Sequence, residues 1–385
     1  MKKIVKHLDK PLLVVTILLF ALGLIMVFSA SNVTAYMSHA VSPYNYFFKQ
    51  LFFLIVGLVA AIIMICIPMK TYSKYSNLLM FIGVLSLALL PVFGTVKNDA
   101  KSWYDLKLFS IQPSEFVKII TILWLSCYYD KKSKKLDKYA PSMFPLAIAG
   151  IAAYFIFEQP DLGTTIIYGV IICSIYWISP VKKNLKFKSG FIAMGIILLG
   201  AIILFGTGGT LLRDRQLERL TEYRNPCDKL LTSGNQVCNS YIAINKGGLT
   251  GEGLGNSTQK YLYLPEPYTD FIYAIIVEEL GLVTGIGLIL AYIFILYRIL
   301  KIGRQSYTDK EAMICFGTAV YIFTHIAVNL LGLFGLIPMT GVPLPFMSYG
   351  GSFTICLIIS LALVQRISVE NGVTSERQTK KTKRQ

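Results

Sequence analysis

The chain has 385 residues, of which 54% are hydrophobic and only 15% are charged, and its formal net charge is +16. A soluble protein carries roughly 25% charged residues, so this composition excludes the ordinary soluble classes. Apolar runs of about 17 residues or more recur along most of the chain, and each is long enough to cross a hydrocarbon core as a helix. Because the runs are continuous and do not alternate, they predict helices and not a membrane barrel.

We therefore predict an all-α integral membrane protein with about ten transmembrane helices. The first apolar run follows several lysines and resembles the start of a secretory signal. Pro11 to Phe28 is longer than a usual signal core, however, and further spans follow, so we expect a retained helix. The predicted helices lie near residues 11–31, 47–67, 77–95, 113–128, 142–158, 163–179, 190–207, 270–297, 311–337 and 350–366.

The charge distribution predicts the orientation. Most of the 37 Lys and Arg residues lie in the N-terminal segment, in the gaps between helices that share its side, and in the C-terminal tail. The positive-inside rule therefore predicts that both termini are cytoplasmic. The same basic residues attract anionic lipid. They are spread over several separate segments, which argues against nucleic-acid binding.

Two regions follow from this topology. Residues 1–368 form a polytopic membrane domain, and residues 369–385 form a basic cytoplasmic tail that composition predicts to be disordered. One large extracellular loop, 208–269, connects helices 7 and 8, and its glycines and prolines indicate an ordered loop. Residues 211–224 resemble a basic amphipathic helix, which either lies on the headgroups or holds a pyrophosphate. Cys227 and Cys238 share this loop and either form a disulfide or stay free.

Ionisable residues at the edge of a membrane are candidates for function. Glu115 and Lys118 are three residues apart on the fourth helix, so they share a face; they form either a structural ion pair or part of a substrate cavity. Asp161 begins the sixth helix and is either its N-cap, a cavity residue, or both. Glu278 and Glu279 are expected to pair, with Lys118 or an outer arginine as partner.

Asp270 is the candidate with the most direct chemistry. It lies where the large loop re-enters the membrane, at the level where a lipid-linked substrate presents its polar head. A partly desolvated carboxylate there suits general-base chemistry. The alternative is that Thr269 or Asp270 caps the following helix.

Two further segments carry many glycines or prolines. Gly251 to Gly255 has a spacing that weakly resembles a nucleotide-binding loop, but no strand precedes it and it lies outside the membrane, so we reject that function. Residues 337–352 hold three prolines and three glycines, which exclude a simple helix. Such irregular backbone must be buried in protein or line a wet cavity.

Four segments together resemble the SEDS family, the shape, elongation, division and sporulation proteins. Trp103 with the run Gln112 to Lys118 is similar to that family's outer loop and fourth span, and Gln159 to Thr164 to its turn between spans five and six. Gly251 to Glu279 resembles its large loop and eighth span, and Gly341 to Ser352 its Pro-Phe-x-Ser-Tyr-Gly-Gly-Ser signature. Gly255-Asn256-Ser257 followed by Gln259-Lys260 is closest to the division branch.

The resemblance implies a peptidoglycan glycosyltransferase that polymerises lipid II during cell division, with inversion at the donor sugar. It implies that Asp270 is catalytic and that either a divalent cation, Mg or Mn, or the cations of the large loop neutralise the leaving phosphates. The residues expected to line the substrate cavity are Trp103, Glu115, Lys118, Asp161, Lys260, Glu266, Ser348 and Tyr349. The implied partners are undecaprenyl-pyrophosphate-linked glycan, a class B penicillin-binding protein and divisome proteins, at the septal cell membrane.

The sequence also departs from the family. Tyr268 stands where the family usually has His, so no histidine assists at that position. Three alternatives stay open: a lipid II flippase, which needs a cavity open to both faces in turn; a polymerase of elongation or sporulation; and a scaffold without chemistry. The candidate acids cluster at the outer side, which favours a polymerase over a flippase.

Overall fold

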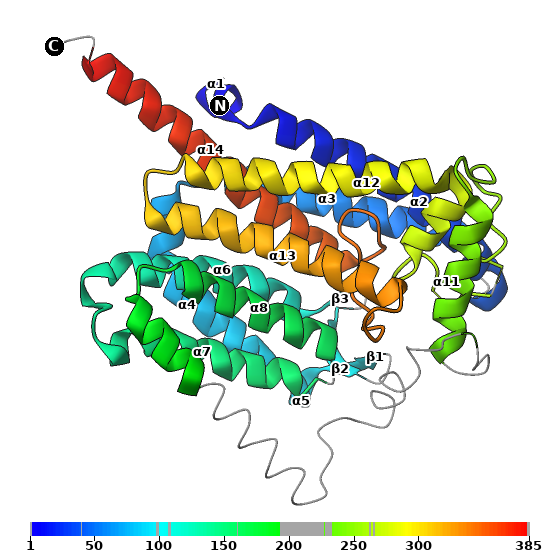
Figure 1. Ribbon diagram of the computed structural model, residues 1–385, viewed down its shortest axis with the longest axis horizontal. Helices are drawn as coiled ribbons and strands as arrows, with labels where there is room; N and C mark the ends of the chain where they lie inside the picture. The colour runs from blue at the N-terminus through cyan, green and yellow to red at the C-terminus, as the bar shows by residue number, and fades with distance from the viewer. Residues whose placement is uncertain are drawn as a thin grey trace, which may run out of the picture.

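A computed structural model describes residues 2–39, 41–97, 100–106, 109–159, 161–192, 227, 233–261, 263–264 and 266–382. The chain folds as a bundle of long helices that run side by side (Figure 1). In one part α2 (Lys10–His39) packs on α3 (Asn45–Cys66) and α12 (Ile272–Arg304), and these two helices pack on α14 (Gly351–Thr382). In the other, α4 (Met69–Ala88), α6 (Pro113–Lys131), α7 (Tyr139–Phe157) and α8 (Leu162–Ile178) pack together, and α13 (Asp309–Leu333) joins the two.

The predicted membrane class is confirmed. Within the described residues six helices are long and apolar enough to cross a membrane, namely α2, α3, α7, α12, α13 and α14. Nine of the ten predicted segments coincide with described helices, and the seventh, 190–207, lies almost entirely outside the described residues. We therefore treat the chain as a multi-pass membrane protein.

The helices differ in where they place polar residues. α2 and α3 expose large apolar side chains such as Leu18 and Phe48, as expected for lipid-facing surfaces. α6 and α13 lie inside the bundle and bury Glu115, Lys118 and His325. Buried charged groups need partners, so the centre of this protein is where polar contacts must be made.

Both ends of the chain meet at one end of the bundle. α1 (Lys2–His7) contacts α14, where Lys6 pairs with Glu376, and Arg298 of α12 forms an ion pair with Asp9. The C-terminal tail, residues 369–385, was predicted to be disordered. That prediction is wrong for residues 369–382, which continue α14 without interruption to Thr382. These contacts with α1 supply packing that composition alone does not reveal.

The opposite end carries the shorter elements. A turn of helix, α5 (Leu90–Phe93), precedes three short antiparallel strands, β1 (Thr95–Lys97), β2 (Ala100–Asp105) and β3 (Ser110–Ile111), in the order β1-β2-β3. No strand was predicted in this segment. α11 (Ser233–Gly247) stands at the same end and packs on α12, while the 3₁₀ turn η1 (Ser133–Lys135) lies after α6.

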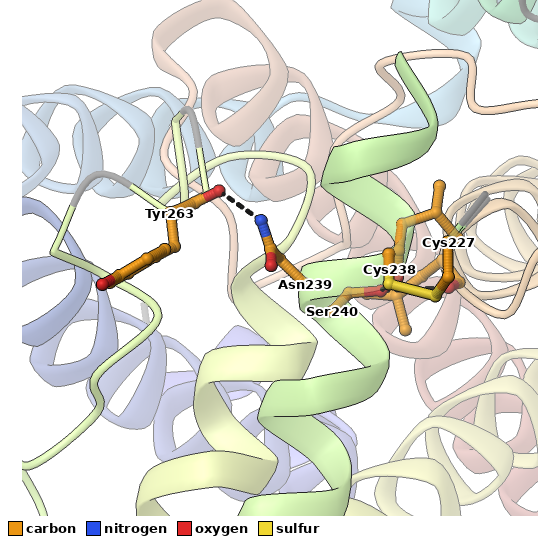
Figure 2. Close-up of a disulfide and its surroundings, with 7 residues drawn as sticks. Cys227, Cys238, Asn239, Ser240 and Tyr263 are labelled. Atoms are coloured by element: carbon orange, nitrogen blue, oxygen red, sulfur yellow. Dashed lines mark hydrogen bonds between the residues drawn. A yellow bond between two sulfur atoms is a disulfide. The ribbon is translucent and has the colours of Figure 1, made fainter. Parts of the chain in front are cut away.

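The disulfide left open by the sequence is present. Cys227 and Cys238 are joined, with their Cα atoms 5.0 Å apart (Figure 2). Next to it the Asn239 side-chain amide donates to the Tyr263 carbonyl at 2.8 Å. These two contacts attach α11 to the preceding and the following loop. The predicted amphipathic helix 211–224 lies outside the described residues.

The loop after α11 is fastened to a kink in α12. Gly281 has a φ of +82°, and a Cβ there would lie 2.3 Å from the Leu249 carbonyl oxygen, so only glycine permits this approach. The Glu252 N–H donates to the Glu278 carbonyl at 2.9 Å, and the Gly253 N–H to the Glu279 carbonyl at 2.9 Å. The Gly-rich segment is therefore a structural contact with α12.

Candidate functional site

Asp270 lies in a backbone segment held by three hydrogen bonds in succession. The Tyr349 N–H donates to the Tyr268 carbonyl at 2.9 Å, and Ser348 Oγ donates to the Thr269 carbonyl at 2.6 Å. Asn329 Nδ2 donates to the Asp270 carbonyl at 2.9 Å and to the Val342 carbonyl at 2.8 Å. We call these contacts the carbonyl clamp. It fixes the backbone of Asp270 from both α13 and the irregular segment 337–350.

The Asp270 carboxylate faces Gly341. A Cβ at position 341 would lie 3.4 Å from Asp270 Oδ2, and Gly341 has a φ of +72°, which side chains other than glycine rarely adopt. Glycine thus leaves room beside the carboxylate. Asp270 is partly exposed, and α12 begins at Ile272 with no side-chain cap, so the alternative capping role of Thr269 or Asp270 is wrong.

Three tyrosines surround the clamp. The ring of Tyr46, from the start of α3, lies 4.5 Å from that of Tyr268 and 5.2 Å from that of Tyr349. Burial, together with a hydrogen bond to Tyr46, raises the pKa of the Tyr268 phenol above its usual value. Burial likewise raises the pKa of Tyr349 to about 12. Both phenols therefore stay neutral at physiological pH.

Glu115 and Lys118 form the ion pair that their spacing predicts. Lys118 Nζ lies 2.8 Å from Glu115 Oε1, and both side chains are buried. Pro113 begins α6, and Glu115 lies in its first turn, where the helix dipole favours a negative charge. Within the described residues, Glu115 Oε2 has no hydrogen-bond partner. A buried carboxylate oxygen without a partner costs about 1–3 kcal/mol, so it calls for an explanation.

Asp161 is the N-cap of α8, as one of the sequence alternatives proposed. Its carboxylate accepts from the Thr164 N–H at 2.9 Å and from Gln112 Nε2 at 3.3 Å. The turn also contacts the irregular segment, since a Cβ at Gly163 would lie 2.6 Å from Val342. Asp161, Gln112 and the start of α6 are thus brought together at the same end of the bundle as Asp270.

The other residues predicted to line the cavity lie in several separate places. Lys260 is buried and pairs with Glu279 at 3.0 Å, so the expected pairing of Glu279 with Lys118 or an arginine is wrong. Glu266 is exposed, and its carbonyl accepts from the Thr269 N–H at 3.1 Å. Trp103 lies half-buried in β2, opposite Thr95 of β1. Ser348 and Tyr349 act through the clamp just described.

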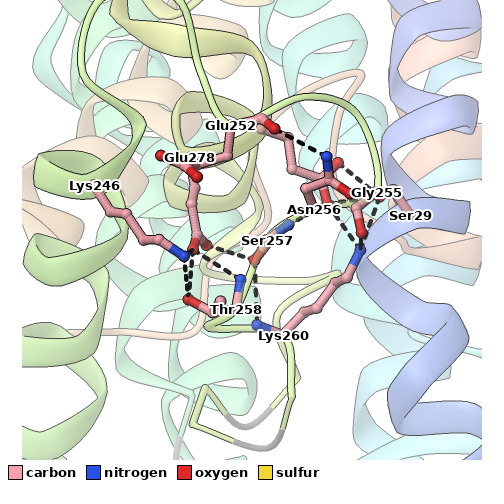
Figure 3. Close-up of polar contacts among 10 residues, drawn as sticks. Ser29, Lys246, Glu252, Gly255, Asn256, Ser257, Thr258, Lys260 and Glu278 are labelled. Carbon is pink, nitrogen blue, oxygen red and sulfur yellow. Dashed lines mark hydrogen bonds and ion pairs between the residues drawn. The ribbon is translucent and has the colours of Figure 1, made fainter.

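Lys260 belongs to a buried network that we call the loop anchor (Figure 3). Both Glu279 oxygens accept from Ser29 Oγ, at 2.8 and 2.6 Å, and Ser257 Oγ donates to Glu278 Oε2 at 2.5 Å. The Thr258 N–H donates to the other Glu278 oxygen at 2.9 Å. The loop anchor consists of Ser29, Ser257, Thr258, Lys260, Glu278 and Glu279.

Two residues of α13 that contact the site were not predicted from the sequence. Asn329 completes the carbonyl clamp, and His325 lies 3.1 Å from Lys118 Nζ. They are four residues apart and thus on one helix face. A polar pair at this spacing in an otherwise apolar span is a signal that could have found them.

The sequence has known relatives. The sequence matches the cell cycle protein family FtsW/RodA/SpoVE over residues 10–372. It is 36% identical to a probable peptidoglycan glycosyltransferase FtsW of Bacillus subtilis, covering 96% of this chain and 92% of that one. It is also 36% identical to stage V sporulation protein E of Bacillus subtilis, covering 94% and 96%.

The fold has a solved counterpart. A chain from a solved structure, "Structural coordination of polymerization and crosslinking by a peptidoglycan synthase complex", superposes with a TM-score of 0.74 at 21% identity, covering 94% of this chain and 98% of that one. That likeness concerns the fold alone. The family match spans nearly the whole chain, and the chain therefore belongs to the FtsW/RodA/SpoVE family of cell cycle proteins.

Proposed function

We propose that this protein is a peptidoglycan glycosyltransferase that polymerises lipid II into glycan strands during cell division. The observation that carries the proposal is the carbonyl clamp, which holds a partly exposed carboxylate, Asp270, in one place at one end of the bundle. A general base must be held at a fixed position to reach the proton that it removes. The name of the Bacillus subtilis FtsW relative, a probable peptidoglycan glycosyltransferase, supports the same activity.

In the proposed reaction Asp270 removes the proton from the 4-hydroxyl of the acceptor GlcNAc. The oxygen attacks the anomeric carbon of the donor MurNAc, a new glycosidic bond forms, and the bond to undecaprenyl pyrophosphate breaks. The pyrophosphate leaves with the electron pair, and the donor sugar inverts. General-base assistance of this kind contributes about 10²–10⁴-fold to a rate. Glu115, Lys118 and Asp161 are proposed to line the cavity that receives the substrate.

A divalent cation, Mg²⁺ or Mn²⁺, is a further part of the proposal. The described residues bring together no group of three or more His, Cys, Asp or Glu that could hold a metal ion. They therefore do not by themselves form such a site. Mg²⁺ in phosphate chemistry often uses one or two carboxylates and the phosphates of the substrate. We assign no step of the reaction to it.

The proposed partners are a class B penicillin-binding protein, which would crosslink the new strands, and divisome proteins at the septum. Support for the first comes from the superposing structure, which is that of a peptidoglycan synthase complex. A role in sporulation is a second candidate, because the stage V sporulation protein E of Bacillus subtilis is as similar as the FtsW relative, at 36% identity.

The test is lipid II polymerisation by the purified protein with its cognate transpeptidase, comparing wild type with Asp270→Asn and with Glu252→Gln. Glu252 is the control, since it is an exposed acid of the same loop that is not among the predicted cavity residues. We expect glycan strands from wild type and Glu252→Gln, and a loss of about 10³-fold for Asp270→Asn. Equal product from Asp270→Asn would remove Asp270 from the mechanism. No product from any protein, with lipid II crossing a liposome membrane, would favour a flippase.

A further inference from the structure

His325 is a buried histidine that has no assigned role in the proposed reaction. Its side chain lies in α13 at 1% exposure, and its ring stacks on Phe353 with centroids 4.8 Å apart. Nδ1 lies 2.8 Å from the Tyr321 carbonyl oxygen, and Nε2 lies 3.1 Å from Lys118 Nζ. Both ring nitrogens therefore have a hydrogen-bond partner, one on its own helix and one on α6.

These two contacts decide which nitrogen carries the proton. A lysine ammonium only donates hydrogen bonds, so His325 Nε2 must accept. A carbonyl oxygen only accepts, so Nδ1 must carry the hydrogen and donate it to Tyr321. The ring is thus neutral with its proton on Nδ1, and the backbone carbonyl of Tyr321 holds it in this tautomer.

The contact with His325 also shapes the ion pair beside it. Lys118 Nζ is shared between Glu115 Oε1 at 2.8 Å and His325 Nε2 at 3.1 Å, and it lies 5.6 Å from the centroid of the Tyr321 ring. Lys118 therefore reaches only one oxygen of Glu115. The other, Oε2, has no hydrogen-bond partner within the described residues. In the loop anchor, by contrast, both oxygens of Glu279 have partners.

We propose that His325 is a positioning residue: it draws Lys118 to one side of Glu115 and leaves Glu115 Oε2 to accept a hydroxyl or amide hydrogen of the sugar substrate. This deepens the proposed function and rests on it for the identity of the substrate. Folding has already removed water from this carboxylate oxygen. A hydrogen bond from the substrate therefore adds binding free energy without a further desolvation cost at Glu115. His325 itself need not touch the substrate.

The first test does not depend on enzymatic activity. The chain has only three histidines, so ¹⁵N-histidine NMR of the full protein in bilayers gives few signals, and the one lost in His325→Gln belongs to His325. We expect a protonated Nδ1 and a bare Nε2, with the Nε2 signal shifting in Lys118→Met. A proton on Nε2, or on both nitrogens, would overturn the proposal even if the protein proved not to be a polymerase.

The second test separates positioning from packing. A glutamine at 325 can offer Lys118 an oxygen acceptor, whereas leucine cannot. We expect His325→Leu to lower kcat/KM for lipid II by about ten- to hundredfold, as for a lost hydrogen bond to a charged group. His325→Gln should recover most of this loss. The histidine control is His7→Gln, which lies at the opposite end near Glu376.

Two kinetic results would contradict the proposal. Equal kcat/KM in wild type and His325→Leu would show that Lys118 needs no acceptor from α13. Equal losses in His325→Leu and His325→Gln, matched by lower melting temperatures, would assign His325 a packing role only. If wild type itself makes no glycan, the proposed polymerase activity is wrong. The tautomer measured by NMR then still tests whether His325 accepts a hydrogen bond from Lys118.

Discussion

The loop anchor and the Glu115–Lys118 pair both bury a lysine against a glutamate, yet they satisfy these groups to different degrees. In the loop anchor all four oxygens of Glu278 and Glu279 accept hydrogen bonds. In the pair on α6, Glu115 Oε2 is left without a partner within the described residues. In our proposal the complete network holds a loop in place, whereas the incomplete one leaves Glu115 ready for a ligand. Burial is common to these acids, and the number of hydrogen-bond partners is what distinguishes them.

The largest expected effect tests the loop anchor. Lys260→Met removes the cation beside Glu279, and breaking a buried pair on one side costs about 3–5 kcal/mol. We expect a marked fall in melting temperature, and activity that falls only with the folded fraction. Lys246→Met is the control, since Lys246 is partly exposed and 3.9 Å from Glu278, and it should cost less than about 1 kcal/mol. Similar melting temperatures for the two variants would refute the structural role of Lys260.

A double replacement tests the other side of the comparison. Lys118→Met combined with Glu115→Leu removes both charges, and such a swap for apolar residues is often neutral for stability. We expect a melting temperature near that of wild type but a loss of polymerisation of about a hundredfold. The matched double change in the loop anchor, Lys260→Met with Glu279→Leu, should instead unfold more easily, because Ser29 and the Ser257 N–H lose their acceptor. Retained polymerisation in the first variant would exclude the pair from the site.

A smaller effect is expected at the carbonyl clamp. Ser348→Ala removes the hydrogen bond to the Thr269 carbonyl and the acceptor of the Leu344 N–H, and each such hydrogen bond contributes about 1 kcal/mol to stability. Since the clamp holds the residue next to Asp270, kcat should fall about tenfold while KM changes little. Ser86→Ala is the control, because its Oγ donates to Gly83 within its own helix. Identical kcat values in the two variants would argue against the clamp.

The smallest effect concerns pH. Burial raises the pKa of Tyr268, and of Tyr349 to about 12, whereas an unfolded tyrosine titrates near about 10. Above pH of about 10 the unfolded chain therefore loses these protons first, and stability falls as pH rises through the folded pKa values. Tyr268→Phe should make the fall in melting temperature between about pH 10 and pH 11.5 less steep. An unchanged slope would mean that Tyr268 is not buried in solution.

Local rules predicted much of the end of the bundle that carries Asp270. The three-residue spacing of Glu115 and Lys118 predicted their pairing, and the position of Asp161 before an apolar run predicted its N-cap. Both depend only on the regular geometry of a helix and its first turn. Capping at Thr269 or Asp270 was the alternative that the same reasoning offered, and it is wrong, because the backbone there is held from outside the helix.

The sequence by itself determined that this is a polytopic helical membrane protein, where most of its helices begin, and that Asp270 lies at the re-entry of the large loop. Only the tertiary structure decided which polar groups meet. Asn329 reaches Asp270 across 59 residues, and Ser348 reaches Thr269 across 79. Such contacts depend on how whole helices pack, and helix packing is set by the sum of many apolar contacts and by close approaches such as that at Gly281. No local pattern of residues encodes that sum.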